Sequence, residues 1–187
     1  MKIFTFTDAL IIAAECHRNI ADGGGVDYIK HPLHLAHELK IRGYSNECQM
    51  AALLHDVLED GDPAIYNEAY LISHGVPESV MVALRLLNHV RDDAFIATHT
   101  EILVNQGVNP KFAKVRAKEE EYMRYVRKLA KNDIARAVKI ADLEHNSQIS
   151  RIKESDLEDF KTREYIGRRN MKYAAARSYL TGGRVGY

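Results

Sequence analysis

The stretch AALLHDVLED, residues 51–60, decides the fold predicted for this chain. Six of its ten residues are apolar and recur at helical spacing, which predicts a buried helix. Four ionisable side chains interrupt this pattern, namely His55, Asp56, Glu59 and Asp60. Burying charged groups is costly unless they find partners, so such a helix needs an explanation for them. The simplest alternative is a set of solvated charges near a helix end.

The spacing of these four residues points to a bound cation. His55 and Glu59 are four residues apart, as are Asp56 and Asp60, so each pair lies on one helix face. Adjacent His55 and Asp56 point about 100° apart, so they converge only on a point beyond the helix edge. A divalent metal ion can occupy that point, because neutral imidazole and carboxylate are ordinary metal ligands.

Two further segments carry candidate ligands inside apolar helical patterns. AVKIADLEHN, residues 137–146, has Asp142 in its middle, and YIKHPLHLAHEL, residues 28–39, places His31 before a proline at a helix start. A site built from His31, His55, Asp56 and Asp142 has two imidazoles and two carboxylates. It leaves room for water and a substrate oxygen, as a hydrolytic metal site requires.

Three other histidines lie close to these candidates in the sequence. His34 and His37 continue the three-residue spacing from His31, but His37 is turned too far around a helix to share one ion easily. We interpret His34 and His37 as surface or packing residues. We interpret His145 as a packing residue or a support behind a ligand.

Composition excludes several classes of function. Lys plus Arg and Asp plus Glu both total 26, so the chain has no basic field for a nucleic acid. No stretch approaches the roughly 20 apolar residues of a membrane span, and ALIIAA near the N-terminus is better explained by a first helix than by a signal peptide. Cys16 and Cys48 match no metal spacing, so we expect reduced thiols in a cytoplasmic protein.

The same pattern predicts an all-α chain. Most segments show helical spacing, and none alternates cleanly over the length of a strand. Its 187 residues predict one domain over 1–180 and a disordered tail over 181–187, with no oligomeric state specified. Residues 90–117 are less regular, with a loop at NQGVNPK. We expect helices to begin at Thr5 or Thr7 and at Asn132. Four further helices are expected to span Pro32 to Gly43, Ser45 to Gly61, Asp62 to Gly75, and Ser155 to about Leu180.

Three motifs, in this order, resemble those of the HD-domain metal-dependent phosphohydrolases: YIKHP (28–32), AALLHDVLED (51–60) and VKIADLEHN (138–146). They are most similar to the hydrolase domain of the alarmone (ppGpp) synthetase/hydrolases and to the small alarmone hydrolases. The resemblance covers about residues 5–152. It implies an all-α helical bundle with a metal site between core helices, and removal of the 3′-pyrophosphate of (p)ppGpp to give GDP or GTP plus pyrophosphate.

The resemblance also implies roles for individual residues. Four would hold the metal, typically manganese, namely His31, His55, Asp56 and Asp142. Glu59 and Asp60 would orient or deprotonate the attacking water. Tyr28 and Asn146 would lie beside the nucleotide substrate. The ligand types themselves also accept iron, zinc, cobalt or magnesium.

The chain departs from the family in the loop ADGGGVD, residues 21–27, where basic residues are usual. Gly23 stands where a lysine is expected, and Arg18 upstream is the candidate replacement. Because this loop bears on nucleotide recognition, two alternatives remain open. One is a phosphatase acting on a nucleoside monophosphate or NADPH. The other is a non-catalytic HD-fold binding or antitoxin-like module, against which the intact Glu59–Asp60 pair argues.

Overall fold

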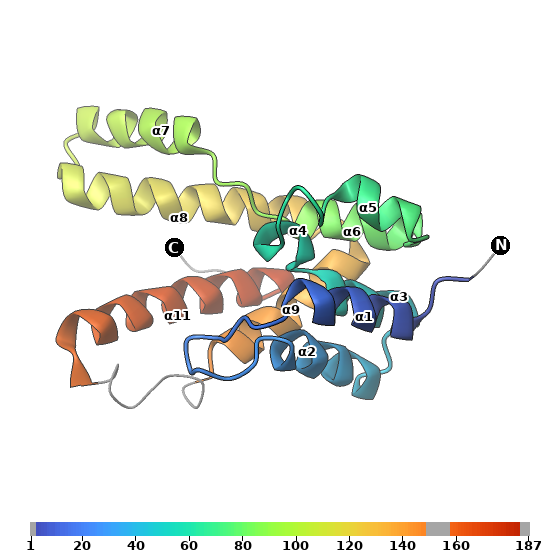
Figure 1. The fold of residues 1–187 in the computed structure, drawn as a ribbon. Helices are drawn as coiled ribbons and strands as arrows, with labels where there is room; N and C mark the ends of the chain where they lie inside the picture. Colours follow the sequence, from blue (N-terminus) through green and yellow to red (C-terminus); the bar gives the residue numbers. More distant parts are fainter. Residues whose placement is uncertain (1–2, 149–157, 184–187) are drawn as a thin grey trace.

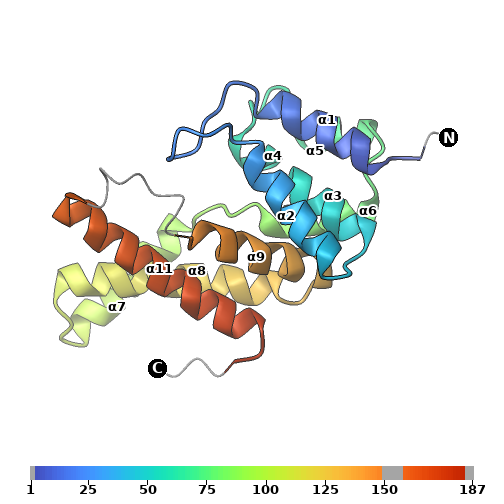
Figure 2. The same ribbon diagram turned by 90° about the horizontal axis from the view of Figure 1, so that it is seen from below.

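A computed structural model describes residues 3–148 and 158–183 of the chain. Within these ranges the fold is all-α, as predicted, with one isolated antiparallel bridge between Ala21 and Asp27 and no strand. The helices, drawn in Figures 1 and 2, are α1 Phe6–Cys16, α2 Lys30–Ile41, α3 Asn46–Leu54, α4 Val57–Asp60, α5 Glu68–Ser73, α6 Glu78–Leu87, α7 Asp93–Asn105, α8 Pro110–Leu129, α9 Asp133–Asn146 and α11 Phe160–Leu180.

Helix α3 forms the centre of the bundle. It packs against α1, α2, α6 and α9, and every residue from Cys48 to Leu54 is buried. Removal of this apolar surface from water is the main stabilising contribution to such a core. Helices α2 and α9 also pack on each other, so the three segments with candidate ligands are neighbours. None of the helices described is long and apolar enough to cross a membrane.

Several predicted helix boundaries are confirmed. Thr5 caps α1 in a reciprocal pair with Asp8, and the side chains of Ser45 and Asn132 cap α3 and α9. Each cap satisfies an amide that has no partner inside its helix. Gly43 follows α2 with φ of 79°, a conformation that glycine adopts without steric cost. The predictions for Ser155 and for residues 184–187 lie outside the described ranges.

The predicted continuous helix from Ser45 to Gly61 is wrong, because the chain breaks after Leu54 and resumes as α4 at Val57. In a continuous helix the carbonyl oxygen of Ala52 would accept from the amide of Asp56. Here it accepts instead from Nδ1 of His55, at 2.8 Å. Local side-chain bonds of this kind compete with helical ones. The break therefore lies at the two residues whose side chains are candidate ligands.

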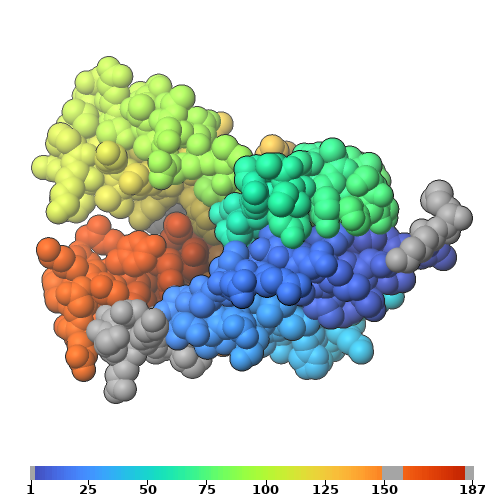
Figure 3. All heavy atoms as spheres, in the orientation of Figure 1, coloured from blue at the N-terminus to red at the C-terminus, as the bar shows by residue number. Residues whose placement is uncertain are grey.

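Two further expectations are corrected. Helix α5 begins at Glu68, where Asn67 is the cap, and Asp62 instead holds a turn by accepting from the amide of Ala64. Residues 90–117 are not irregular but contain α7 and the start of α8. Helix α7 has a single buried residue, Ile96, although its sequence also contains Phe95, Ile102, Leu103 and Val104. With α8 it forms a hairpin that projects from the bundle as a separate lobe (Figures 1 and 3).

Candidate metal centre

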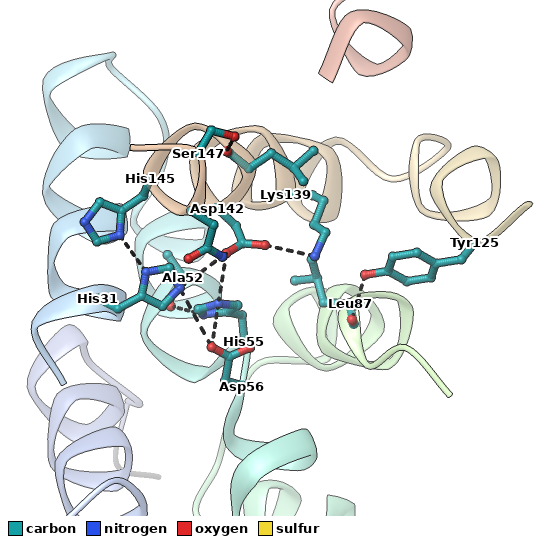
Figure 4. A network of polar contacts seen from close by, with 12 residues as sticks. His31, Ala52, His55, Asp56, Leu87, Tyr125, Lys139, Asp142, His145 and Ser147 are labelled. Carbon is teal, nitrogen blue, oxygen red and sulfur yellow. Dashed lines mark hydrogen bonds and ion pairs between the residues drawn. The ribbon is translucent and has the colours of Figure 1, made fainter. Parts of the chain in front are cut away.

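Four predicted ligands come together where α2, α3 and α9 meet (Figure 4). His31 lies in the first turn of α2, His55 and Asp56 follow α3, and Asp142 lies within α9. Nε2 of His55 lies 2.9 Å from Oδ2 of Asp56 and 3.9 Å from Oδ1 of Asp142. Nε2 of His31 lies 3.3 Å from Oδ1 of Asp142 and 3.9 Å from Oδ2 of Asp56. Each imidazole thus lies within 4 Å of both carboxylates.

These distances fit a single divalent cation. Metal bonds of about 2.1 Å place neighbouring ligand atoms about 3.0 to 3.4 Å apart, and opposite ones about 4.2 Å apart. The donor atoms of His31, His55 and Asp56 all lie within 4.8 Å of one another, and Asp142 contacts both imidazoles. Within the described ranges, the buried Nε2 of His55 also has no partner with hydrogen-bond geometry. A metal ligand bond would satisfy this atom.

Each histidine is held from behind by its other ring nitrogen. Nδ1 of His55 donates to the carbonyl of Ala52, which leaves Nε2 as the ring nitrogen that faces the cluster. Nδ1 of His31 lies 2.6 Å from Nδ1 of His145, so one of these two nitrogens carries the proton between them. The ring of His34 stacks on His145 at 4.1 Å. Such contacts fix the orientation of metal-binding imidazoles.

The carboxylates are held in the same way. Nζ of Lys139 lies 2.9 Å from Oδ2 of Asp142, and the side-chain amide of Asn146 donates to Oδ1 at 2.6 Å. The hydroxyl of Tyr28 donates to Oδ2 of Asp56. Lys139 therefore contacts a candidate ligand and not an open pocket. Tyr28 and Asn146 were both predicted to lie beside a nucleotide. Each of them hydrogen-bonds a carboxylate of the cluster.

The cluster favours positive charge at its centre. Burial works against ionisation of all these groups, yet Asp56 and Asp142 together raise the pKa of His55 to about 9. Burial alone would raise the pKa of Asp56. The charge of His55 and its hydrogen bond outweigh this effect and lower the pKa of Asp56 to about 2. Lys139 and the histidines likewise hold the pKa of Asp142 below its ordinary range. A cation at this point would supply the charge that these carboxylates attract.

A pocket of about 460 Å³ lies beside the cluster. Its walls include Tyr28, Asp60 and Asn146, all predicted for the site, together with Gly23 and Arg169. Nη2 of Arg169 donates to the carbonyl of Asn146 at 3.3 Å. Within the described ranges, its buried Nε has no hydrogen-bond partner.

Arg18, the predicted replacement for the missing loop lysine, does not line this pocket. It is exposed after α1, where its charge acts on Tyr66. Sequence analysis missed Arg169, which lies on α11 beside several other basic residues. The packing of α11 against α9 determines which arginine of this helix faces the pocket, and the sequence does not show this packing.

The two acids after the cluster occupy different surroundings. Asp60 lines the pocket near Tyr28, whereas Glu59 does not line it and lies within electrostatic reach of Lys139 and His89. Loss of hydration and the nearby Asp56 carboxylate raise the pKa of both groups, although both side chains keep solvent exposure. Carboxyl groups with raised pKa values beside a metal site are typical of proton-transfer residues.

Comparison with known proteins identifies the class of protein. The model of the HD domain family matches residues 9–161, so the chain belongs to this family. No curated protein matches the chain.

A solved structure of a metazoan ortholog of SpoT, described as hydrolysing ppGpp and as having a role in starvation responses, is similar to this one. The TM-score is 0.61 with 20% sequence identity, over 99% of this chain and 90% of the other. At this identity the match shows a shared fold. Family and fold together support the predicted metal-dependent phosphohydrolase.

Proposed function

We propose that the protein removes the 3′-pyrophosphate of (p)ppGpp in a metal-dependent hydrolysis. One observation carries this proposal: Tyr28 and Asn146 each hydrogen-bond a candidate ligand and also line the adjacent pocket. A phosphate group in that pocket would therefore lie next to the metal cluster. The three ordered motifs and the fold shared with a ppGpp hydrolase support guanosine tetraphosphate or pentaphosphate as the substrate.

His31, His55, Asp56 and Asp142 would hold the metal, which we propose to be manganese, with iron, zinc, cobalt or magnesium as alternatives. When bound, a divalent ion lowers the pKa of water and neutralises charge on phosphoryl oxygens. The residues behind the ligands keep them in place: Ala52 and His145 orient the imidazoles, and Lys139 orients Asp142.

Proton transfer falls to the two acids after the cluster. Hydrolysis adds water across the bond between the ribose 3′ oxygen and the first phosphorus, and releases pyrophosphate and GDP or GTP. A carboxylate oxygen of Glu59 or Asp60 would take a proton from the attacking water, a role that their raised pKa values suit. The guanidinium of Arg169 would bind a phosphate of the nucleotide.

The test is direct. The protein is loaded with Mn²⁺, incubated with ppGpp, and assayed for pyrophosphate. We expect release of one pyrophosphate for each GDP formed, and loss of this activity on chelation. If the loaded protein released no pyrophosphate, the proposed substrate would be wrong.

A second candidate is favoured by the charge of the pocket. Among the residues that the structure describes, its lining contains one cation, Arg169, and two carboxylates, Asp22 and Asp60, which is a weak match for a nucleotide with four or five phosphates. A nucleoside monophosphate, or the 2′-phosphate of NADPH, carries less charge. A panel of these nucleotides assayed for inorganic phosphate, beside ppGpp assayed for pyrophosphate, separates the two candidates.

A further inference from the structure

A second pocket, larger than the first, lies between the α7–α8 hairpin and α11. Its volume is about 620 Å³, within the range of about 300 to 1,000 Å³ that small-molecule sites occupy. It has no lining residue in common with the pocket beside the metal cluster. Figure 3 shows the hollow between these two parts of the molecule. The HD motifs contribute nothing to its walls.

Each of the three helices around this second pocket contributes at least one apolar residue to its walls. Leu103 comes from α7, Met123 from α8, and Met171 and Ala175 from α11. Met171 is 75% exposed, whereas Met123 is buried, so the two methionines border the pocket at its rim and at its base. Unbranched thioether side chains adapt to the shape of a ligand. The walls therefore suit an apolar ligand body.

The charges of the pocket leave an excess of one positive charge. Lys172 and Arg116 line it, and neither has an ion-pair partner in the described ranges. Of the two lining carboxylates, Glu120 pairs with Arg127 at 2.6 Å, which leaves Glu119. Two unpaired cations and one unpaired carboxylate favour a ligand with a single negative charge.

Lys172 is a half-buried cation in contact with two aromatic rings. Its ammonium lies 4.3 Å from the centre of the Tyr122 ring and 5.4 Å from that of Tyr173. Burial, with a smaller contribution from the nearby charge of Lys139, lowers its pKa. Ring contacts compensate only part of the cost of removing an ammonium from water. An anionic group on a ligand would complete the compensation.

We propose that this second pocket is a binding site for a small monoanion with an apolar body. The apolar body would lie between Met123 and Met171, and the anionic group would bind Lys172 and Arg116. The site is separate from the proposed hydrolytic centre, and the inference does not depend on the proposed substrate.

The fluorescent probe 8-anilino-1-naphthalenesulfonate has this chemistry and tests the site in the full chain. Calorimetry is expected to show one bound probe for each chain. The five methionines allow the site to be located by ¹³C-methyl labelling. Probe binding should shift the methyl signals of Met123 and Met171, while those of the core residues Met50 and Met81 stay in place.

Two substitutions remove the two properties of the site separately. Lys172→Met removes the charge and keeps an apolar side chain, and is expected to weaken probe binding about tenfold. Ala175→Trp fills the cavity and should abolish binding. Lys161→Met on the exposed face of α11 is the matched control, with unchanged affinity. Arg116→Gln, on an exposed side chain, gives a second charge variant should Lys172→Met fail to fold.

Two further ligands distinguish the parts of the probe. Inorganic phosphate alone should not bind at millimolar concentration, and the uncharged N-phenyl-1-naphthylamine should bind about tenfold more weakly than the sulfonate. The proposal is overturned by absence of probe binding, by equal affinity in Lys172→Met, Arg116→Gln and the parent chain, or by methyl shifts confined to other methionines. Each of these outcomes leaves the hydrolysis assay unaffected, so the two proposals stand or fall separately.

Discussion

The metal cluster and the pocket beside it differ in how their side chains are held. In the cluster every candidate ligand has a second contact: Ala52 for His55, His145 for His31, Tyr28 for Asp56 and Lys139 for Asp142. In the pocket, Gly23 has no side chain to contribute, and within residues 3–148 and 158–183 Arg169 makes one hydrogen bond, to the Asn146 carbonyl.

This difference follows from what we propose that each part binds. A metal ion requires donor atoms at fixed distances from one point, which restricts residue type and position together. A nucleotide phosphate can be bound by a cation from any element that reaches it. The cluster is therefore visible as a motif in the sequence, whereas the cation of the pocket comes from a helix outside the motifs.

Removing a ligand should have the largest effect. Asp56→Asn keeps the shape of the side chain and an acceptor for Tyr28, but removes the charge that attracts the cation. We expect loss of bound metal and of hydrolysis, by more than the roughly 10- to 100-fold that loss of a supporting contact costs. Metal content by mass spectrometry and the pyrophosphate assay measure both. Asp133→Asn, on an exposed side chain, is the control, and full metal content in Asp56→Asn would contradict the assignment.

Removing the contact between His145 and His31 should have the next largest effect on metal binding. His145→Phe keeps an aromatic ring between His31 and His34 but removes the nitrogen that contacts Nδ1 of His31. We expect metal affinity to fall about 10- to 100-fold. Calorimetric titration of the metal-free protein measures it. His34→Phe changes the outer ring of the same stack and should leave metal affinity unchanged; equal losses in both variants would indicate a packing effect only.

Much of the cluster could be predicted from the sequence, because its ligands sit in apolar helices where a charge stands out. The break at His55–Asp56 could not, since it depends on a side chain bonding to the carbonyl of Ala52. Helix α7 was missed because its large apolar residues form two short contiguous runs, Phe95–Ile96 and Ile102–Val104, separated by polar residues. Arg169 was missed because its neighbour Arg168 is chemically identical, and helix packing alone distinguishes them.

Substitutions of the neighbours Arg168 and Arg169 test whether the pocket binds the nucleotide. Arg168 is exposed and paired with Glu164, while Arg169 lines the pocket. Arg169→Gln should raise KM for the nucleotide about tenfold, equivalent to about 1.5 kcal/mol for a hydrogen bond to a charged group. Metal affinity should not change. Arg168→Gln should leave both quantities unchanged, and a KM effect equal to that of Arg169→Gln would contradict the proposed role.

Restoring a cation to the loop is expected to have a smaller effect. A side chain at Gly23 would meet no atom within 4 Å, so Gly23→Lys should fold normally. Its ammonium would be exposed at the pocket mouth, where such a charge contributes about 0.5 to 1 kcal/mol, or two- to fivefold. We expect KM for ppGpp to fall by this factor and KM for a nucleoside monophosphate to fall less. Gly23→Gln is the uncharged control; no difference between Lys and Gln would argue against binding of a highly charged nucleotide.

The smallest effect concerns the acid beside the cluster. Loss of hydration and the Asp56 carboxylate raise the pKa of Glu59 in the folded chain above that in the unfolded chain. The folded state therefore holds this proton more tightly, so raising the pH through the folded pKa lowers the free energy of unfolding. Glu59→Gln cannot ionise and should slightly raise the melting temperature of the metal-free protein at pH 7.

This gain should disappear in acid, where Glu59 is protonated in both states, and should shrink when metal is added, because a cation favours the ionised carboxylate. Thermal melts across pH, with and without Mn²⁺, measure both trends, and Glu101→Gln on an exposed side chain is the control. A lower melting temperature for Glu59→Gln at neutral pH without metal would mean that this carboxylate stabilises the fold. The raised pKa and the role in proton transfer would then both be wrong.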